Sequence, residues 1–501
     1  MQRALTALLI LSASCGGSRE AAPTEERPPD IFLIVIDTLR ADRMSAYGWP
    51  RPTTPNLKKL ADEGTRFADV TSQCSWTKPS MVSMWTGQYV TAYQDNMHAD
   101  QPNLPETLQY RGYKTIGVAG NVLLSEVEGF HRGFDHYDAR RLTQKQRRKR
   151  AKAGGEGGPC RNGYELIQDF LRPIDEFLDR NQGVDPAERQ PLFAYLNPME
   201  PHAPYLPRER LAEILPEGPG IQKLPTDWHQ EQWNALGIKP LGRDPGWKGT
   251  WAEMERSRVL YERELLFLDK LLGGLFDELT ERGLMDDAVV IIASDHGEAM
   301  FDHPNLRTPE QLKKIRPNIF FQMQHGENLY QELLATPLIF WGRGVAAGHV
   351  VDDPVENLDL FPTLVEMCGL PPSDELHGHS LVPYLRQEPG PDRESVHAFV
   401  LNHVMAREVS SNMKLIVPTQ IGTTRGAKPR LYNLSEDPQE RNDLYGTDQE
   451  STSRLAGILD RWKESHPTRI TNALMKDPTT FADLRDLGYI GDEEPVDEEQ
   501  D

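Results

Sequence analysis

The chain alternates between short apolar runs and longer segments with helical periodicity. Residues 31–36 form a continuous apolar run rich in β-branched side chains, which is typical of a strand buried on both faces of a parallel sheet. Similar runs recur along the chain at 115–119, 192–196, 288–293 and 337–341. This alternation predicts an α/β fold with a large, mostly parallel sheet flanked by helices.

Two helices are clearly marked in the sequence. Residues 55–63 begin with a proline and stop before Gly64, and residues 253–282 carry leucines at helical spacing and stop before Gly283. After about residue 376 the pattern changes to short strands and one helix, at 396–401, 413–417, 430–433 and 453–465. We therefore expect a smaller C-terminal α+β subdomain packed on the large sheet.

The N-terminus has the pattern of a secretory signal peptide. One positive charge precedes a short apolar run, and small residues follow up to Cys15. The run is too short to span a bilayer, which takes about 20 residues. The small residues before Cys15 resemble a bacterial lipobox, although Ser12 replaces the usual leucine. We expect an extracytoplasmic lipoprotein, in the periplasm or on the cell surface, whose only membrane contact is a lipid anchor at Cys15. Plain secretion and a disordered cytoplasmic N-terminus are the alternatives.

Changes in composition and in the pattern of apolar residues divide the chain into five expected parts. These are a signal peptide (1–15), a polar tether (16–29), a catalytic domain (30–375), a C-terminal subdomain (376–485) and an acidic tail (486–501). The tether and the tail are too poor in apolar residues to order themselves.

Composition narrows the class of protein. The 501 residues, 38% of them hydrophobic, can bury a large core, which excludes a disordered chain and an integral membrane bundle. With 55 basic and 76 acidic residues the net charge is −21, which argues against a nucleic-acid partner.

One basic segment, 140–158, runs into a glycine-rich stretch and is interpreted as a solvated insertion; binding of anionic lipid headgroups or substrate is the alternative. Beyond Cys15 three cysteines remain, which allow at most one internal disulfide.

Polar side chains follow three of the predicted strands. Asp37 comes directly after the first strand, Asp295 and His296 follow the strand that ends at 293, and His202 follows the strand that ends at 196. In open α/β sheets, ligands bind where the strands have their carboxyl ends. Two carboxylates and an imidazole at that edge predict a site for a divalent cation.

A short helix is predicted to start at Thr77 or Lys78, with Pro79 just inside it and Gly87 at its end. Thr77 then has two interpretations. It is either an ordinary N-cap, or a hydroxyl placed where backbone N–H groups and the helix dipole favour an anion. If a cation contacts the same oxygen, the hydroxyl becomes a competent nucleophile towards phosphorus or sulfur.

Several motifs resemble those of the sulfatase family within the alkaline phosphatase superfamily, in family order from about residue 30 to 444. They are DTLR at 37–40, TPNL at 54–57, TKPS at 77–80 with TG at 86–87, PHAPY at 201–205, DHGE at 295–298, HG at 325–326 with LY at 329–330, DLFPT at 359–363 and LYNL at 431–434.

The resemblance implies a role for each matching residue. It implies these ligands of a divalent cation: Asp37, Thr77, Asp295 and His296. Thr77 would also be the nucleophile. His202 and His325 would contact the anionic oxygens or the leaving group of the substrate; both could instead be structural histidines. Lys78 and Arg40 are weaker candidates for charge compensation.

The sequence departs from the usual family pattern at four positions. Thr77 replaces the cysteine or serine that is oxidised to formylglycine, and threonine cannot yield an aldehyde because its β-carbon carries a methyl group. Met81 replaces an arginine, Thr38 stands where many sulfatases have a second aspartate, and His296 stands where they often have asparagine. A ligand set richer in nitrogen favours Mn²⁺ or Zn²⁺ over Ca²⁺ or Mg²⁺, without excluding either of the latter.

The resemblance therefore predicts a metal-dependent hydrolase of anionic esters with a threonine nucleophile. Phosphate or phosphonate esters are expected in preference to sulfate esters, with a small molecule or an envelope component as substrate. Two alternatives stay open: transfer of a phospho-headgroup to an acceptor in the cell envelope, and a non-catalytic envelope protein that binds an anion. Specificity is expected to lie in the inserted segments 140–158 and 215–251.

Overall fold

The computed structural model describes residues 27–90, 97, 102–152, 160–203, 205, 251–304, 321–326, 328–371, 376–400, 403–419 and 428–466. The signal peptide with Cys15, residues 16–26 of the tether, the segment 215–250 and the acidic tail lie outside the described residues, as do residues 153–159 of the basic insertion. Among the described residues, no helix combines the length and apolar character needed to cross a membrane.

The core of the fold is an eight-stranded sheet with the strand order β11-β2-β10-β7-β1-β6-β4-β5. In that order the strands are β11 (His349–Val351), β2 (Thr65–Phe67), β10 (Leu338–Gly342), β7 (Ala288–Ser294), β1 (Asp30–Ile36), β6 (Leu192–Asn197), β4 (Lys114–Ala119) and β5 (His136–Asp138). The predicted mostly parallel sheet is confirmed. Strand β10 is an exception, because it pairs antiparallel with both β7 and β2. Its sequence did not indicate this direction.

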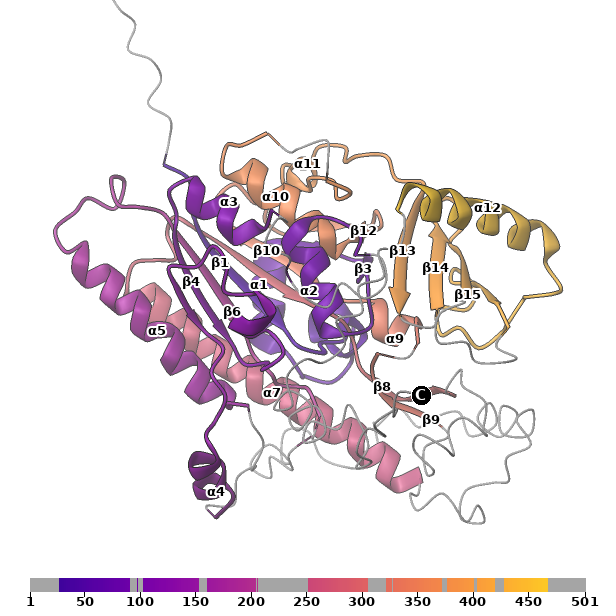
Figure 1. The fold of residues 1–501 in the computed structure, drawn as a ribbon, viewed down its shortest axis with the longest axis horizontal. Coiled ribbons are helices and arrows are strands. Elements are labelled where there is room, and N and C mark those ends of the chain that lie inside the picture. The colour runs from indigo at the N-terminus through magenta and orange to yellow at the C-terminus, as the bar shows by residue number, and fades with distance from the viewer. Residues whose placement is uncertain are drawn as a thin grey trace, which may run out of the picture.

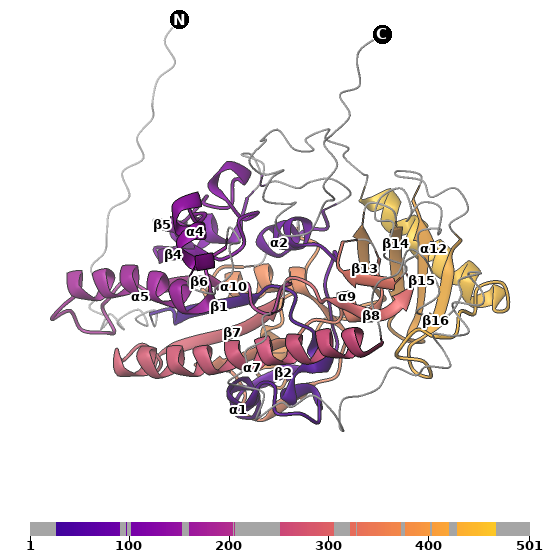
Figure 2. The same ribbon diagram turned by 90° about the horizontal axis from the view of Figure 1, so that it is seen from below.

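Helices cover both faces of this sheet. Ile31, Leu33 and Val35 of β1 belong to a hydrophobic cluster with α2 (Thr77–Thr86), α3 (Leu104–Tyr110) and α10 (Leu360–Met367). The alternate β1 residues Phe32 and Ile34 pack with α1 (Pro55–Glu63), α5 (Gly163–Arg180) and α7 (Trp251–Glu281). Figure 2 shows α2 on one side of β1 and β7, with α1 and α7 on the other. Burial on both faces explains why these strands are apolar at every position.

The C-terminal part is an antiparallel sheet beside this body, as Figure 1 shows. It consists of β13 (Ser395–Val400), β14 (His403–Glu408), β15 (Met413–Pro418) and β16 (Arg430–Asn433), with α12 (Gln449–Ser465) packed on β14 and β15. Strand β14 was not predicted, whereas the other three strands and the helix were. The exact limits 30–375 and 376–485 stay predictions.

A buried polar network joins the C-terminal sheet to the main body. The Lys414 ammonium of β15 lies 2.7 Å from a carboxylate oxygen of Glu440, and both side chains are fully buried. Lys414 also donates to the Gln331 side chain at 3.0 Å, and His303 Nδ1 contacts Glu332 Oε1 at 2.7 Å. Gln331 and Glu332 both belong to α9 (Gln331–Leu334). The network therefore links the C-terminal sheet and the main body through one short helix.

The remaining elements are short. They are β3 (Val70–Thr71), β12 (Val355–Glu356), β8 (Ala299–Pro304), β9 (Phe321–Gln324), α4 (Gln144–Lys152), α11 (Val382–Leu385) and the 3₁₀ turns η1 (Ala41–Arg43), η2 (Ser45–Tyr47), η3 (Glu126–Glu128) and η5 (Asn357–Asp359). Helix α4 forms the helical part of the predicted basic insertion. The three described cysteines form no disulfide.

Candidate active site

The sheet topology brings the predicted metal ligands together. Strands β1 and β7 are parallel neighbours, and Ile36 at the end of β1 pairs with Ser294 at the end of β7. The next residues, Asp37 and Asp295, therefore emerge side by side at the carboxyl edge. Asp37, Asp295 and His296 are all fully buried, and each offers a ligand atom within 4.8 Å of the others.

The electrostatics of this cluster fit a cation. Asp37 Oδ1 and Asp295 Oδ2 are buried and accept no hydrogen bond from any described residue. Burial, and then the nearby charge of Asp295, raise the pKa of Asp37 well above its usual range, although His296 and Asn121 oppose this shift. Two buried carboxylates with unsatisfied oxygens are costly unless a positive charge compensates them. The donor set of two carboxylates and one imidazole suits a divalent cation.

His296 is oriented as a metal ligand would need to be. Its Nδ1 donates to the Gly297 carbonyl at 2.8 Å, so Nε2 is the nitrogen with the lone pair. Such a hydrogen bond behind the ring fixes the tautomer and orientation of a ligand histidine.

Thr77 lies at this cluster. It is the first residue of α2, and its Oγ1 lies 3.2 Å from His296 Nε2 and 3.4 Å from Asn121 Nδ2. The predicted start of the helix is confirmed. The interpretation of Thr77 as the N-cap is wrong, because Trp76 occupies the N-cap position. The Thr77 side chain does not cap the helix and lies beside His296 and Asn121.

Ser80 of α2, and Ser72 in the segment before the helix, both bond the strand end that carries Asp295. Ser72 Oγ and Ser80 Oγ each donate to the Asp295 carbonyl at 2.5 Å. Ser80 is one helical turn from Thr77, so these bonds fix the distance between the hydroxyl and the carboxylate.

The backbone after Asp37 is strained. Thr38 has φ = 57°, in the left-handed region that β-branched residues rarely adopt. Its N–H donates to Asp295 Oδ1 at 3.2 Å, and its carbonyl accepts the Tyr261 hydroxyl at 2.8 Å. Strain of this kind costs about 1–3 kcal/mol and clusters at active sites.

Asn121 belongs to the site and was missed in the sequence. It follows the end of β4, and its Nδ2 donates to Asp37 Oδ2 at 2.6 Å while lying beside Thr77. Its own Oδ1 accepts the Leu123 N–H at 2.9 Å, which fixes the orientation of the amide. Its position two residues beyond the predicted strand 115–119 could have marked this polar residue as a member of the site.

The predicted histidines lie next to the metal cluster. The ring centroid of His325 is 4.3 Å from that of His296 and 5.1 Å from that of His202. His202 Nδ1 donates to the Ala203 carbonyl at 2.5 Å, and His325 Nδ1 lies 3.1 Å from Glu298 Oε1. Burial lowers the pKa of His202. Burial raises the pKa of Glu298 to about 8, against the opposing effect of His202.

Lys78 and Arg40, the weaker candidates for charge compensation, each form ion pairs with carboxylates of the chain. The Lys78 ammonium lies 3.2 Å from Glu128. Arg40 pairs with Asp42 and with Asp302, each at 2.7 Å, and donates to the Glu298 carbonyl at 2.9 Å. Arg40 therefore supports the loop that follows His296.

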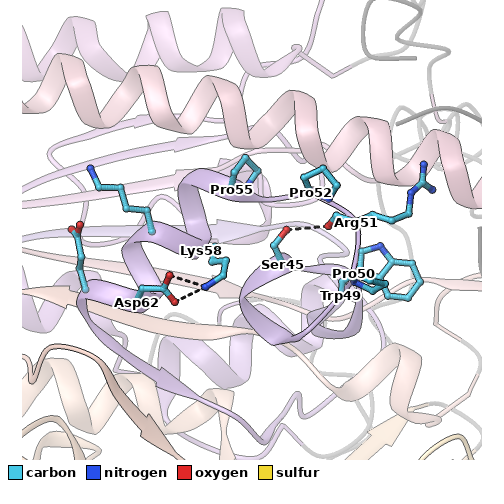
Figure 3. A pocket seen from close by; sticks show the side chains of 10 residues that line it. Ser45, Trp49, Pro50, Arg51, Pro52, Pro55, Lys58 and Asp62 are labelled. Atoms are coloured by element: carbon cyan, nitrogen blue, oxygen red, sulfur yellow. Dashed lines mark hydrogen bonds and ion pairs between the residues drawn. The ribbon is translucent and has the colours of Figure 1, made fainter. Parts of the chain in front are cut away.

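A groove of about 490 Å³ lies over η2 and α1, separate from this cluster (Figure 3). Its wall includes Trp49, Pro52 and Lys58, and Lys58 is paired with Asp62 at 2.7 Å. The described residues that line it do not include any predicted site residue.

Carboxylates, imidazoles and a hydroxyl gathered at the carboxyl edge of an α/β sheet can together take part in the cleavage of an ester bond. The sulfatase family model matches residues 29–370, and a model described as "N-sulphoglucosamine sulphohydrolase, C-terminal" matches residues 324–457. The chain belongs to the sulfatase family and is an ester hydrolase.

Relatives match over most of their length. Human arylsulfatase A is 27% identical, with 84% of each chain covered. N-acetylglucosamine-6-O-sulfatase of Bacteroides thetaiotaomicron is 22% identical, covering 87% of this chain and 85% of its own. The crystal structure of the phosphonate monoester hydrolase of Agrobacterium radiobacter superposes with a TM-score of 0.64 at 20% identity, covering 87% of this chain and 95% of that chain. The superposition supports the fold.

Proposed function

We propose that this chain is a metal-dependent hydrolase of anionic esters in which Thr77 is the nucleophile, with phosphate or phosphonate esters preferred over sulfate esters. The observation that carries the proposal is the position of Thr77 Oγ1, 3.2 Å from His296 Nε2 at the N-terminus of α2. A threonine cannot follow the formylglycine route, which favours direct attack on phosphorus. The likeness to a phosphonate monoester hydrolase fold is consistent with this preference.

Asp37, Asp295 and His296 would hold the divalent cation, with Mn²⁺ or Zn²⁺ favoured over Ca²⁺ or Mg²⁺ by the imidazole. When bound, the cation would supply Lewis-acid stabilisation of negative charge.

In the first step the bond from Thr77 Oγ1 to phosphorus forms and the bond from phosphorus to the ester oxygen breaks. The proton of the Thr77 hydroxyl passes to the unprotonated Nε2 of His202 or His325, and the same ring then gives this proton to the leaving oxygen, so protons balance. The N–H groups and dipole at the start of α2 stabilise the negative charge that develops. In the second step water cleaves the threonine ester, which restores the hydroxyl and releases the acid.

The test is a panel of aryl phosphate monoester, phosphodiester, phosphonate and sulfate substrates against wild type, Thr77→Ala and Thr77→Ser, with metal content and melting temperature measured alongside. We expect Thr77→Ala to lose at least about a thousandfold in kcat while it keeps its metal and its fold. Thr86→Ala is the matched control, because Thr86 lies at the other end of α2 and bonds the Val82 carbonyl at 2.7 Å. Full turnover by Thr77→Ala would overturn the role of Thr77, and a faster reaction with the sulfate would overturn the ester preference.

Two further expectations are tested with the same protein. Glycerol added to the assay would yield a glycerol ester if the chain is a transferase, and free acid alone if it is a hydrolase. We also propose that Cys15 carries a lipid anchor outside the cytoplasm, and we then expect Cys15→Ser to release the full-length chain from the membrane fraction.

A further inference from the structure

The three imidazoles of the site are all held through Nδ1, but by different acceptors. His296 and His202 donate to the backbone carbonyls of Gly297 and Ala203, at 2.8 Å and 2.5 Å. His325 Nδ1 instead lies 3.1 Å from a carboxylate oxygen, Glu298 Oε1. Because a carbonyl oxygen only accepts, the first two rings carry their proton on Nδ1, and Glu298 in its ionised form selects the same tautomer for His325.

The fold brings Glu298 and His325 together through the antiparallel pairing of β8 with β9. Glu298 directly precedes β8 and His325 directly follows β9, and Ala299 at the start of β8 pairs with Gln324 at the end of β9. Glu298 and His325 therefore directly flank the terminal pair Ala299–Gln324 of the two strands. Their meeting is set by the register of β8 and β9.

The backbone of Glu298 is fixed on its other side as well. A Cβ atom on Gly297 would lie 2.0 Å from the Glu332 carbonyl oxygen, so only glycine allows this approach. The Gly297 N–H donates to the Leu333 carbonyl at 2.8 Å, and Arg40 donates to the Glu298 carbonyl at 2.9 Å.

Both side chains of the pair are fully buried. A carboxylate at such a position is costly compared with an apolar side chain of the same size, so packing alone does not account for it. The contact with His325 offers a reason for a carboxyl group to be buried at this position.

The proposed function gives His325 contact with the reacting ester, and the following inference rests on it. We propose that Glu298 is a positioning residue that holds His325 in the Nδ1–H tautomer and fixes its ring, so that Nε2 is the nitrogen that meets the substrate. Without this acceptor the ring can turn and take the other tautomer, which presents the wrong nitrogen. Partners that orient a metal-ligating histidine in this way are worth about 10- to 100-fold in activity, and we expect an effect of the same size for His325.

The test is a double-mutant cycle with Glu298→Gln, His325→Gln and the double variant, measured as kcat and KM on the best ester of the panel. Either single change is expected to lower kcat about 10- to 100-fold with KM little changed, and the double variant is expected to be no slower than the slower single variant. Losses that multiply would show that Glu298 acts independently of His325 and would overturn the proposal. Glu332→Gln is the matched control, because Glu332 is a buried partner of His303 outside the site; it should lower stability and leave kcat unchanged.

A second readout does not depend on turnover. With ¹⁵N-labelled histidine, the signals that His325→Gln removes should report the Nδ1–H tautomer in wild type and a mixture of tautomers in Glu298→Ala. Identical tautomers in both proteins would overturn the positioning role while leaving the threonine mechanism intact. An active Thr77→Ala protein with coupled Glu298 and His325 would overturn the threonine mechanism alone.

Discussion

Replacing Asn121 by alanine tests whether the site is organised as the geometry indicates. Asn121 Nδ2 donates to Asp37 Oδ2 at 2.6 Å and lies 3.4 Å from Thr77 Oγ1, so one amide holds both the proposed ligand and the proposed nucleophile. Alanine removes this link and leaves Asp37, already fully buried, with one acceptor more to satisfy.

The magnitude follows from the kind of bond that is lost. A hydrogen bond to a charged group contributes about 1.5–3 kcal/mol. If that energy appears in the transition state, kcat/KM falls about 10- to 150-fold. Because the Asn121 bond lowers the pKa of Asp37 against the effect of burial, its loss also favours the protonated acid, and we expect the metal affinity to fall about 10- to 100-fold.

The assay compares kcat/KM at saturating metal, which separates weaker metal binding from lost positioning. Asn103→Ala is the matched control, because Asn103 is equally buried and caps α3 by accepting the Glu106 N–H at 2.9 Å. That variant should lose about 1 kcal/mol of stability and keep its activity. If Asn121→Ala were as active as Asn103→Ala at saturating metal, the reasoning about this amide would be refuted.

Three further predictions concern stability. Lys414→Met leaves the Glu440 carboxylate buried without its cation and should cost about 3–5 kcal/mol in urea denaturation, more than the joint change with Glu440→Leu. Ser80→Ala removes a 2.5 Å bond to the Asp295 carbonyl and should cost about 1 kcal/mol together with a measurable loss of kcat, whereas unchanged kinetics would contradict the link between α2 and that strand end. Burial lowers the pKa of His397 from 6.5 to about 3, so the unfolded chain binds this proton first. His397 should therefore contribute a fall in stability of about 1.4 kcal/mol per pH unit as the pH drops below 6.5, and His397→Phe should reduce the measured slope by that amount.

The sequence was sufficient for features that depend on local pattern. Apolar runs identified the long central strands, because a strand covered on both faces must be apolar at each position. Pro79 and Gly87 marked the ends of α2, and Asp37 and Asp295 were identifiable because they directly follow two such strands. The short strands β2, β5 and β11 have three residues each, too few for a periodic signal.

Several contacts at and around the site were decided only by the tertiary structure. The antiparallel course of β10, the amide of Asn121 beside Asp37, and the contact of Glu298 with His325 depend on strand order and register across long sequence separations. The same holds for Lys78 and Arg40, whose carboxylate partners come from other segments. Residue type and local pattern can be taken directly from the sequence. Contacts between distant residues depend instead on how whole strands pair, and the packing of the complete core determines that pairing.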